Sequence, residues 1–356
     1  MKKVLCLTRY GFSGSSSRYR FYQFFPYLEK DNFDVLVTPF FNDKYVNNLY
    51  SDHREILFYN PLYAYLKRTF KLLFDHSYDL VWMEKEALPW IPASIEQLLY
   101  RSSIPYVIDY DDAVYHRYDQ HHNPLIREVL SNKISKIMFL STVVIAGNRY
   151  IAEYAKDSGA GRVEILPTVV DTEAYTQKYS ERNGNFTIGW IGSPSTSRHI
   201  NVALLALNQL CKNSDVQFSA IGALEKDVSL IPGQLIPWDE RSESRELTRF
   251  DVGIMPLPDT PWERGKCGFK LIQYMACGLP VIASPTGVNV EIVNHGVNGF
   301  LAGSTEEWIK YLDILKADPD LCRKMGAAGR QKVESDYSLQ KTAPRLVELL
   351  KEAAEA

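Results

Sequence analysis

The chain has 356 residues, of which 46% are hydrophobic and 23% are charged, a composition that is ordinary for a globular protein and a length that favours two domains. Its formal net charge of -3 excludes the overall basic field that holds nucleic acid, so an anionic ligand requires a local cluster of cations. The five cysteines are odd in number and no two have C-x-x-C spacing, which argues against a disulfide framework and against a structural zinc site.

The first residues, MKKVLCLTRYGFSG, contain an apolar run of only a few residues. A signal peptide needs a longer apolar core, and a helix that spans a membrane needs about 20 apolar residues. The sequence therefore predicts a cytoplasmic protein without a membrane span.

In the first half of the chain, short apolar runs alternate with segments of helical spacing. The sequence predicts strands at 2–8, 33–40, 78–86, 104–112, 142–148 and 163–171, and helices at 20–31, 61–76, 94–102, 132–141 and 149–159. Strands that alternate with helices are typical of parallel β-α-β units. This half is therefore expected to form an α/β domain over residues 1–171.

A polar stretch without periodicity, at 172–185, is the predicted linker, and the alternation restarts after it. Strands are expected at 186–193, 216–223, 251–257 and 280–284, and helices at 197–213, 243–250, 270–278 and 305–319, followed by a helical tail. The chain thus predicts a second α/β domain over 172–335 and a helical segment, 336–356, that packs back on the first domain. Two such Rossmann-like parallel-sheet domains are expected to face a central cleft and to bind ligands beyond the carboxyl ends of their strands.

The loop GFSGSSSRYR, at 11–20, follows the first predicted strand. Glycines such as Gly14 let backbone N–H groups approach a phosphate, and hydroxyls such as that of Ser15 add donors. Arg18 and Arg20 lie where an anion would need partners. The spacing lacks the third glycine of the dinucleotide-binding pattern, so a plain surface loop is an equal alternative.

Three carboxylates, Asp109, Asp111 and Asp112, crowd the end of the predicted strand at 104–112. Like charges this close repel unless a proton, a cation or the hydroxyls of a sugar relieve them. The pattern fits a metal site, a general base or hydrogen bonding to a polyol. It also fits a simple cap on the next helix, where aspartate is favoured.

A Gly/Ser/Pro turn, GWIGSPSTSRH at 189–199, joins a strand to a helix in the second half. Backbone donors at Gly192 and Ser193, together with the dipole of the following helix, favour an anion there, and Arg198 could reach the same anion. The alternative is an ordinary β-α turn with a Ser or Thr cap.

The segment GKCGFKLIQYMACG, at 265–278, places two lysines around Gly268 at the start of a predicted helix. Lys270 in the first turn opposes the helix dipole, so a compensating gain is expected, and a phosphate between Lys266, Lys270 and the helix N-terminus would supply it. Gln273 lies three residues beyond Lys270, on the same helical face. The alternative is a solvated lysine pair in front of a core helix.

Together these motifs resemble a known family. FKLIQYMACGLPVIASPTGVNVEIVNHGVNGFLA, at 269–302, is similar to the donor-binding segment of the retaining glycosyltransferases of family 4, the large group 1 set. GWIGSPST and VGIMPLPDTPWERGK also look like this family, in particular its bacterial surface-polysaccharide branch. The resemblance covers most of residues 1–345. It implies the GT-B fold, with an acceptor-binding first domain and a second domain that binds a nucleotide sugar.

The chain departs from the family pattern at several positions. The family carries two glutamates separated by seven residues in this segment, and their positions here hold Gly265 and Gln273. An amide can still exchange hydrogen bonds with ribose hydroxyls. Arg198 is the nearest match to the family's basic pair for the diphosphate, and the family's histidine near the reacting carbon aligns with Asp111.

The resemblance implies that a sugar moves from a nucleotide diphosphate to an acceptor hydroxyl with retained configuration, by a front-face mechanism without a protein nucleophile, a metal or a cofactor. The departing diphosphate gains negative charge, which cations and backbone N–H groups must stabilise. The implied catalytic residues are Asp111, Lys270 and Arg198, the donor-binding residues are Gly14, Ser15, Gly192, Ser193, Lys266, Cys267, Gly268, Phe269 and Gln273, and the acceptor-binding residues are Arg18, Arg20, Asp109 and Asp112. The alternatives are a sugar-nucleotide epimerase, a phosphorylase and a non-catalytic subunit that binds a sugar nucleotide.

The segment PLYAYLKRTFKLLFDH, at 61–76, bears on the acceptor. As a helix it has Leu62, Leu66, Phe70 and Leu73 on one face, with Tyr63 and Phe74 beside it and Lys67, Arg68 and Lys71 near its border. Such a helix suits a membrane interface that contains anionic lipids, whereas a core-packing helix with a solvated basic face is the favoured alternative. The resemblance implies a glycan or lipid-linked glycan acceptor at the inner face of the plasma membrane, in polysaccharide, lipopolysaccharide or capsule assembly.

Overall fold

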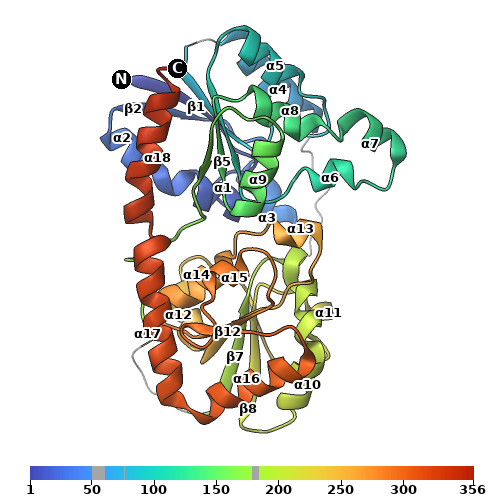
Figure 1. Cartoon of the computed structure of the whole chain (residues 1–356), viewed down its shortest axis with the longest axis vertical. Helices are drawn as coiled ribbons and strands as arrows, with labels where there is room; N and C mark the ends of the chain where they lie inside the picture. Colours follow the sequence, from blue (N-terminus) through green and yellow to red (C-terminus); the bar gives the residue numbers. More distant parts are fainter. Residues whose placement is uncertain (50–60, 76, 179–183) are drawn as a thin grey trace. The chain divides into compact units, whose positions relative to one another are not determined.

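The computed structural model describes residues 1–49, 61–75, 77–178 and 184–356, and it divides into two compact units (Figure 1). The N-terminal unit consists of Met1–Thr168, Gly265–Cys267 and Lys341–Ala356, and the C-terminal unit consists of Val169–Arg264 and Gly268–Gln340. Among the described residues, no helix is both long and apolar enough to cross a membrane. His76 of the predicted helix and residues 179–183 of the predicted linker lie outside the described part of the chain.

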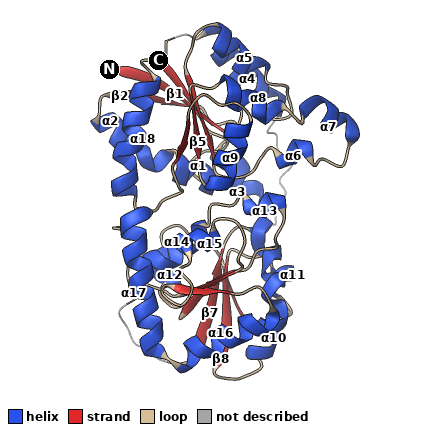
Figure 2. Cartoon of the chain, viewed as in Figure 1, coloured by secondary structure: helices blue, strands red, loops and turns tan. Residues whose placement is uncertain are grey.

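The N-terminal unit is built on a parallel sheet of six strands in the order β2-β1-β3-β4-β5-β6 (Figure 2). The strands are β1 (Lys2–Leu7), β2 (Phe33–Val37), β3 (Leu80–Glu84), β4 (Tyr106–Tyr110), β5 (Val143–Ala146) and β6 (Val163–Ile165). The central strands β3, β4 and β5 are buried along their whole length. Strands covered on both faces read as continuous apolar runs rather than as alternating ones, which is why the sequence reveals them.

Helices join these strands and cover the sheet. They are α1 (Ser15–Arg20), η1 (Tyr22–Phe24), α2 (Phe25–Lys30), α3 (Asp43–Leu49), α4 (Pro61–Phe74), α5 (Ser94–Arg101), α6 (His116–Asp119), α7 (Pro124–Leu130), α8 (Lys133–Leu140), α9 (Arg149–Asp157) and α18 (Leu339–Ala353). In α9, the Asn148 side chain accepts a hydrogen bond from the Ile151 N–H and so caps the helix. Ile151, Ala152 and Ala155 form its buried face, as expected for an amphipathic helix on a sheet.

The C-terminal unit has a second parallel sheet of six strands, in the order β12-β11-β10-β7-β8-β9. The strands are β7 (Phe186–Ile191), β8 (Val216–Ile221), β9 (Gly233–Ile236), β10 (Val252–Met255), β11 (Val281–Ala283) and β12 (Gly299–Leu301). The helices are η2 (Pro194–Ala203), α10 (Leu204–Leu210), α11 (Glu225–Val228), α12 (Glu243–Leu247), α13 (Pro261–Arg264), α14 (Phe269–Ala276), α15 (Asn289–Ile292), α16 (Thr305–Ala317) and α17 (Pro319–Asp336). This strand order is that of a doubly wound Rossmann sheet.

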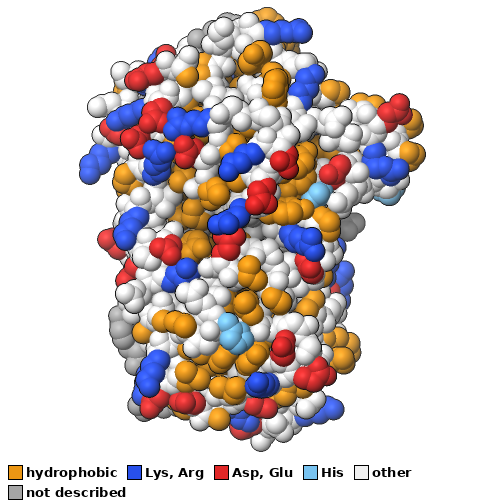
Figure 3. All heavy atoms as spheres, viewed as in Figure 1, with side chains coloured by type: hydrophobic (Ala, Val, Ile, Leu, Met, Phe, Trp, Pro, Cys, Tyr) orange, Lys and Arg blue, Asp and Glu red, His pale blue; other side chains and the backbone are white. Residues whose placement is uncertain are grey.

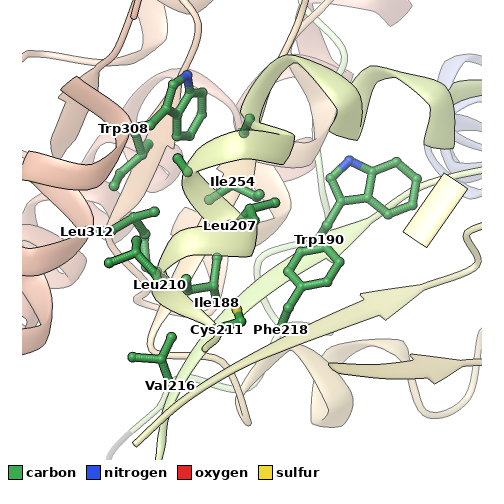
Figure 4. Close-up of a cluster of buried hydrophobic side chains, with 14 of the residues drawn as sticks. Ile188, Trp190, Leu207, Leu210, Cys211, Val216, Phe218, Ile254, Trp308 and Leu312 are labelled. Atoms are coloured by element: carbon green, nitrogen blue, oxygen red, sulfur yellow. The ribbon is translucent and has the colours of Figure 1, made fainter. Parts of the chain in front are cut away.

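One core of the C-terminal unit lies where α10 and α16 pack against β7, β8 and β10 (Figure 4). Its largest fully buried side chains are Trp190 of β7, Phe218 of β8 and Trp308 of α16, each 1% exposed. Burial of a large apolar side chain stabilises the fold by about 1.5–3 kcal/mol. This core fixes the end of β7, which matters for the site described below.

The predicted α/β class with two parallel sheets is confirmed, whereas several short elements differ from the sequence prediction. The helix expected at 20–31 is divided into α1, η1 and α2, and α1 begins at Ser15, inside the predicted loop. The strands β9 and β12 were not predicted, because β9 is largely exposed and β12 has only three residues. On the face drawn in Figure 3, basic and acidic side chains are interspersed, in keeping with a net charge of -3.

Candidate functional site

The carboxyl ends of β7 and β10 are the natural binding position of the C-terminal sheet. β7 lies between β8 and β10. The strands β8 and β9 follow on one side of β7, and β10, β11 and β12 follow on the other side, so the strand order reverses at β7. Ligands of open parallel sheets bind beyond the strand ends at such a switch point. The segments that follow these two strands, 192–199 and 256–264, are therefore the first candidates for a site.

Lys270 lies against the end of β7. Its Nζ is 5.3 Å from the centre of the Trp190 ring, which is a cation–π distance. Gly192 leaves the space that this side chain needs, because a Cβ there would lie 2.7 Å from Lys270 Cε and 2.6 Å from Trp190 Cη2. The structure thus brings together two predicted site residues, Gly192 and Lys270, at one strand end.

The helix that carries Lys270, α14, begins at a left-handed Gly268 with φ of 66°, a backbone that glycine adopts without strain. Leu271, Ile272 and Tyr274 are among its buried residues. The first turn contains Phe269 and Lys270 and has no acidic residue, so it supplies no negative charge to the positive end of the helix dipole. A bound anion would balance both the dipole and the ammonium group.

Gln273 of α14 takes part in a buried hydrogen-bond network. Its Nε2 donates to Glu243 Oε1 at 2.7 Å and to Tyr175 Oη at 3.1 Å. The Glu243 carboxylate also accepts from Tyr175 Oη at 2.7 Å and from Trp238 Nε1 at 2.6 Å. Both amide hydrogens of Gln273 are therefore directed at protein groups, and a contact with a ribose hydroxyl would have to use its carbonyl oxygen.

Glutamate in place of Gln273 is expected to destabilise the C-terminal unit by about 2–3 kcal/mol at pH 8. The new carboxylate would face Glu243, where the amide now donates at 2.7 Å, so the pair must share a proton to remain buried. The loss therefore grows as the pH rises and shrinks as it falls, which melting temperatures between pH 5 and pH 8 will show. The double variant Gln273→Glu, Glu243→Gln restores one amide and one carboxylate and should recover most of the stability. A Gln273→Glu melting temperature equal to that of the wild type at both pH values would contradict this reasoning.

The turn after β7 leads into η2, a 3₁₀ helix, where the sequence predicts a helix. Ser193 occupies its N-cap position without a capping hydrogen bond from its side chain, so the alternative of a Ser or Thr cap at this residue is not what the structure has. The Ser193 Oγ lies 3.0 Å from Ser195 Oγ. Arg198 of η2 is exposed and lines a pocket together with residues that follow β10. The binding roles of Ser193 and Arg198 stay predictions.

In the N-terminal unit, Arg20 and Asp109 form a buried ion pair. Arg20 Nε donates to Asp109 Oδ1 at 2.8 Å and Nη2 donates to Oδ2 at 3.0 Å, while Nη1 donates to the Leu166 carbonyl at 2.8 Å. The two residues are 3% and 2% exposed. Burial raises the pKa of the Asp109 carboxyl to about 6 in spite of the guanidinium. The pair fastens α1 to β4, and its predicted contact with an acceptor stays a prediction.

Asp111 and Asp112 each face a lysine of the same unit. Lys85 Nζ is 2.8 Å from Asp111 Oδ1 and 3.7 Å from Asp112 Oδ2, and Lys266 Nζ is 2.8 Å from Asp112 Oδ1. Burial raises the pKa of Asp111, whereas for Asp112 the two lysines outweigh burial and hold the pKa below its ordinary value. The ammonium groups of Lys85 and Lys266 thus offset the repulsion between the carboxylates of Asp111 and Asp112. Neither residue caps α6, whose N-cap is Tyr115.

Lys266 and Cys267 belong to the N-terminal unit, whereas Gly268 and Lys270 belong to the C-terminal unit. The Cys267 thiol donates to the Asp111 carbonyl at 2.9 Å, and Asn148 Nδ2 donates to the carbonyls of Gly265 and Lys266 at 2.9 and 3.1 Å. The structure therefore does not place the two lysines in one cluster of the same unit. The diphosphate role predicted for Lys266 and Cys267 stays a prediction.

Serine hydroxyls that follow β1, in the predicted Gly/Ser loop, bond to the carboxylate of Glu84. The hydroxyls of Ser16 and Ser17 each donate to Glu84 at 2.6 Å. Gly14 is the N-cap of α1, Ser15 is exposed, and Arg18 is buried with its guanidinium 4.9 Å from the Tyr19 ring centre. Among the described residues, no group of three or more His, Cys, Asp and Glu side chains is arranged to hold a metal ion.

The sequence did not predict roles for Glu84, Lys85 and Glu243. The charges of MEKE at the end of the strand β3 are a signal of the same kind as the aspartates at the end of β4, and the same rule would have found Glu84 and Lys85. Glu243 offers no such signal, because it begins a short helix of ordinary appearance, 30 residues before Gln273.

A family model described as Glycosyl transferases group 1 matches residues 185–318. This segment contains Gly192, Lys270, Gln273 and Glu243. Among curated proteins, a sucrose synthase of Melioribacter roseus is 30% identical over 125 residues, which are 33% of this chain and 15% of the relative. A sucrose synthase of Beta vulgaris is 31% identical over 87 residues, 23% of this chain and 11% of the relative. The similarity thus covers a small part of the length of these enzymes.

Solved structures resemble the chain over almost its whole length. A sucrose-phosphate synthase from Thermosynechococcus elongatus has a TM-score of 0.73 and 15% identity, with 99% of each chain covered. HepE of Anabaena in complex with UDP-glucose has a TM-score of 0.73 and 18% identity, with 99% of this chain and 100% of that chain covered. WaaG, a glycosyltransferase involved in lipopolysaccharide biosynthesis, has a TM-score of 0.69 and 13% identity, with 98% and 99% covered. The chain has the GT-B fold of glycosyltransferases, and its residues 185–318 match the group 1 glycosyl transferase family.

Proposed function

We propose that the protein is a retaining glycosyltransferase that moves a sugar from a nucleoside-diphosphate sugar to an acceptor hydroxyl. One observation carries the proposal: within the segment that matches the group 1 model, Lys270 lies against Gly192 and Trp190 at the end of β7. A cation, a glycine turn and a helix N-terminus at a switch point suit a diphosphate. The structure of HepE with UDP-glucose supports the choice of a uridine nucleotide as the first donor to test.

In the proposed reaction, the bond between the anomeric carbon and the diphosphate oxygen breaks, and a bond from that carbon to the acceptor oxygen forms on the same face. The acceptor hydroxyl gives its proton to the leaving diphosphate, so neither a protein nucleophile nor a pair of catalytic carboxylates is required. Lys270, assisted by Arg198, stabilises the negative charge that develops on the diphosphate, which is the main demand of such a step. The buried hydrogen bond from Gln273 to Glu243 joins α14, which carries Lys270, to α12.

A thermal-shift screen tests the nucleotide part of the proposal. A ligand that binds only the folded state stabilises it by about 2.7 kcal/mol at 100 times its dissociation constant, which corresponds to about 5–10 °C for a unit of this size. UDP, GDP, ADP and CDP, each with a corresponding nucleotide sugar, are the probes, and nucleoside monophosphates serve as matched controls without the second phosphate. If none of the diphosphates raises the melting temperature at 1 mM (roughly ten times a weak dissociation constant), the proposed donor site is wrong.

We further propose that the acceptor is a lipid-linked glycan at an anionic membrane surface. On α4, the apolar side chains of Leu62, Tyr63, Leu66, Phe70, Leu73 and Phe74 are exposed, while Ala64, Arg68 and Leu72 are buried. The prediction that Arg68 is one of the cations at the border is wrong, because its buried guanidinium donates to the carbonyls of Thr8, Thr38 and Ala87. The exposed apolar face with Lys67 and Lys71 nearby has the character of a helix that lies in a membrane interface.

Co-sedimentation with vesicles tests this surface. The wild-type protein is expected to sediment with anionic vesicles at low salt and to be released by added salt. Reversing the charges of Lys67 and Lys71 to glutamate should weaken the partition coefficient by about 30-fold or more, at about 1 kcal/mol per lysine near the surface. Lys212→Glu with Lys226→Glu, two exposed lysines of the C-terminal unit, is the matched control. A wild-type protein that remains in the supernatant at low salt would point to a soluble acceptor.

A further inference from the structure

A pocket of about 620 Å³ lies in the C-terminal unit at the switch point of its sheet. One wall comes from η2, which follows β7, and the other comes from residues 258–263, which follow β10. Pockets of about 300–1,000 Å³ are the usual size for small-molecule sites. Arg198, which we propose as a partner of the diphosphate, lines this pocket, so the pocket shares this residue with the proposed donor site.

The polar wall of the pocket is a buried carboxylate that contacts two neighbouring side chains. Glu263 is 5% exposed and His199 is 6% exposed, and Glu263 Oε1 is 3.3 Å from His199 Nε2. The Thr260 hydroxyl donates to the other carboxylate oxygen, Oε2. A buried carboxylate that accepts from a hydroxyl and lies beside an imidazole is a preorganised acceptor for further O–H donors.

The loop that carries this carboxylate is braced from outside the pocket. Arg264 makes a two-point contact with Asp259, with Nε donating to Oδ1 at 2.7 Å and Nη2 donating to Oδ2 at 2.9 Å. The Arg264 N–H also donates to the Thr260 carbonyl at 3.0 Å. Residues 259–264 thus have hydrogen bonds of their own that support the conformation of this wall.

The remaining wall combines apolar and amide groups. Trp262, Val202 and Pro258 supply apolar surface, and Asn201 supplies an amide that can both donate and accept. Trp262 is half-buried, so part of its indole is available to a ligand. An aromatic face beside a carboxylate and an amide suits a ring that carries C–H groups on its faces and hydroxyls around its edge.

We propose that this pocket binds a pyranose ring, with Glu263 as the acceptor of its hydroxyls, Trp262 as the surface against its apolar face and Asn201 as a second polar partner. The Glu263 carboxylate disfavours a phosphate in the same space, since like charges repel, so a neutral polyol fits better than a second anion. The proposal rests on the proposed function for the source of the sugar, which is either the sugar of the nucleotide donor or a sugar of the acceptor. Glu263 and Trp262 are then residues that determine which sugar is used.

Two binding measurements on the whole chain test the proposal. In the first, isothermal titration compares UDP with UDP-glucose for the wild type and for Glu263→Gln and Trp262→Ala. In the second, saturation-transfer NMR with glucose, galactose and N-acetylglucosamine detects free pyranose binding without any nucleotide. Trp90→Ala removes another partly exposed tryptophan, in the N-terminal unit, and is the matched control. Circular dichroism melting of each variant separates loss of binding from loss of the fold.

A donor subsite predicts that both variants bind UDP like the wild type but lose about tenfold in affinity for UDP-glucose. An acceptor subsite predicts that the preference for UDP-glucose over UDP is unchanged, while the saturation transfer to free pyranoses disappears in both variants and persists in Trp90→Ala. The proposal is overturned if the wild type binds no sugar in either measurement, or if both variants bind every sugar as the wild type does. A wild-type protein that does not bind UDP would contradict the proposed function. The NMR measurement would then test the pocket by itself.

Discussion

Methionine in place of Lys133 is expected to lower the free energy of unfolding of the N-terminal unit by about 3 kcal/mol. Lys133 is buried at the start of α8, and its Nζ lies 2.5 Å from Glu86 Oε2 and donates to the Leu88 carbonyl at 2.7 Å. Glu86 is 2% exposed. Within the described part of the chain, removing the lysine leaves a buried carboxylate whose partners are the Tyr118 hydroxyl at 2.7 Å and two more distant arginines, Arg117 and Arg9, at 3.5 and 3.8 Å.

The pH dependence gives this expectation a second check. Burial favours the neutral acid, but Lys133 outweighs burial and holds the pKa of the Glu86 carboxyl below its ordinary value of 4.5. A lowered pKa means that the pair stabilises the fold above about pH 4.5 and that this contribution is lost as the pH falls further. The difference between wild type and Lys133→Met should therefore be largest near neutral pH and should shrink in acid, as urea unfolding of the N-terminal unit at pH 7 and pH 4 will show.

Two further variants control for the loss of packing. Adding Glu86→Gln to Lys133→Met removes the stranded charge while keeping an acceptor for Tyr118, and should recover more than half of the lost stability. Lys2→Met breaks the exposed pair between Lys2 and Glu355 and should cost less than about 1 kcal/mol. Equal stability losses for Lys133→Met and Lys2→Met would show that the buried pair contributes no more to the free energy of unfolding than the exposed pair does.

Methionine in place of Lys270 is expected to weaken nucleoside-diphosphate binding by about 10–150-fold, because a charge-assisted hydrogen bond to a diphosphate contributes about 1.5–3 kcal/mol. Methionine keeps an unbranched side chain in the space beside Gly192 and over the Trp190 ring, so the change isolates the charge from the packing. Isothermal titration with the diphosphate that gives the largest thermal shift measures the affinity, and the turnover of the sugar nucleotide should fall at least as much.

A matched lysine elsewhere in the same unit separates this effect from a general loss of positive charge. Lys310 Nζ lies 5.5 Å from the Tyr311 ring centre, a cation–π contact similar to that of Lys270, but on the exposed side of α16. Lys310→Met should leave the affinity unchanged within about twofold. If Lys270→Met binds the nucleotide and turns over like the wild type, the assignment of Lys270 to the diphosphate fails.

Much of the fold could be predicted from the sequence because parallel strands buried on both faces produce continuous apolar runs. β3, β4 and β5 are examples, and each lies within its predicted range. Elements that bury little could not be found in this way, and β9, with three of its four residues exposed, is the clearest case. The division of 20–31 into three helical pieces is equally invisible in the apolar spacing, since the spacing stays helical across the breaks.

The candidate site was only partly predictable, for a different reason. Gly192, Lys270 and Gln273 follow from local rules about strand ends and helix starts, and the structure places them in one unit. The partners of charged groups follow from tertiary contacts that no local rule contains. Lys266 is four residues from Lys270 in the sequence, yet its ammonium group pairs with Asp112, and Gln273 finds Glu243.

The tripeptide Gly265–Cys267 limits how the C-terminal unit can be exchanged with that of a homologous protein. It interrupts the C-terminal unit in sequence but belongs to the N-terminal unit, where Lys266 neutralises Asp112 and the Cys267 thiol bonds to Asp111. A chimaera that takes residues 169–340 from a homologue therefore also exchanges three residues of the other half. Such a hybrid is expected to lose the nearer of the two lysines that neutralise Asp112 unless the tripeptide is restored, so the two halves are not freely interchangeable modules in evolution or in design.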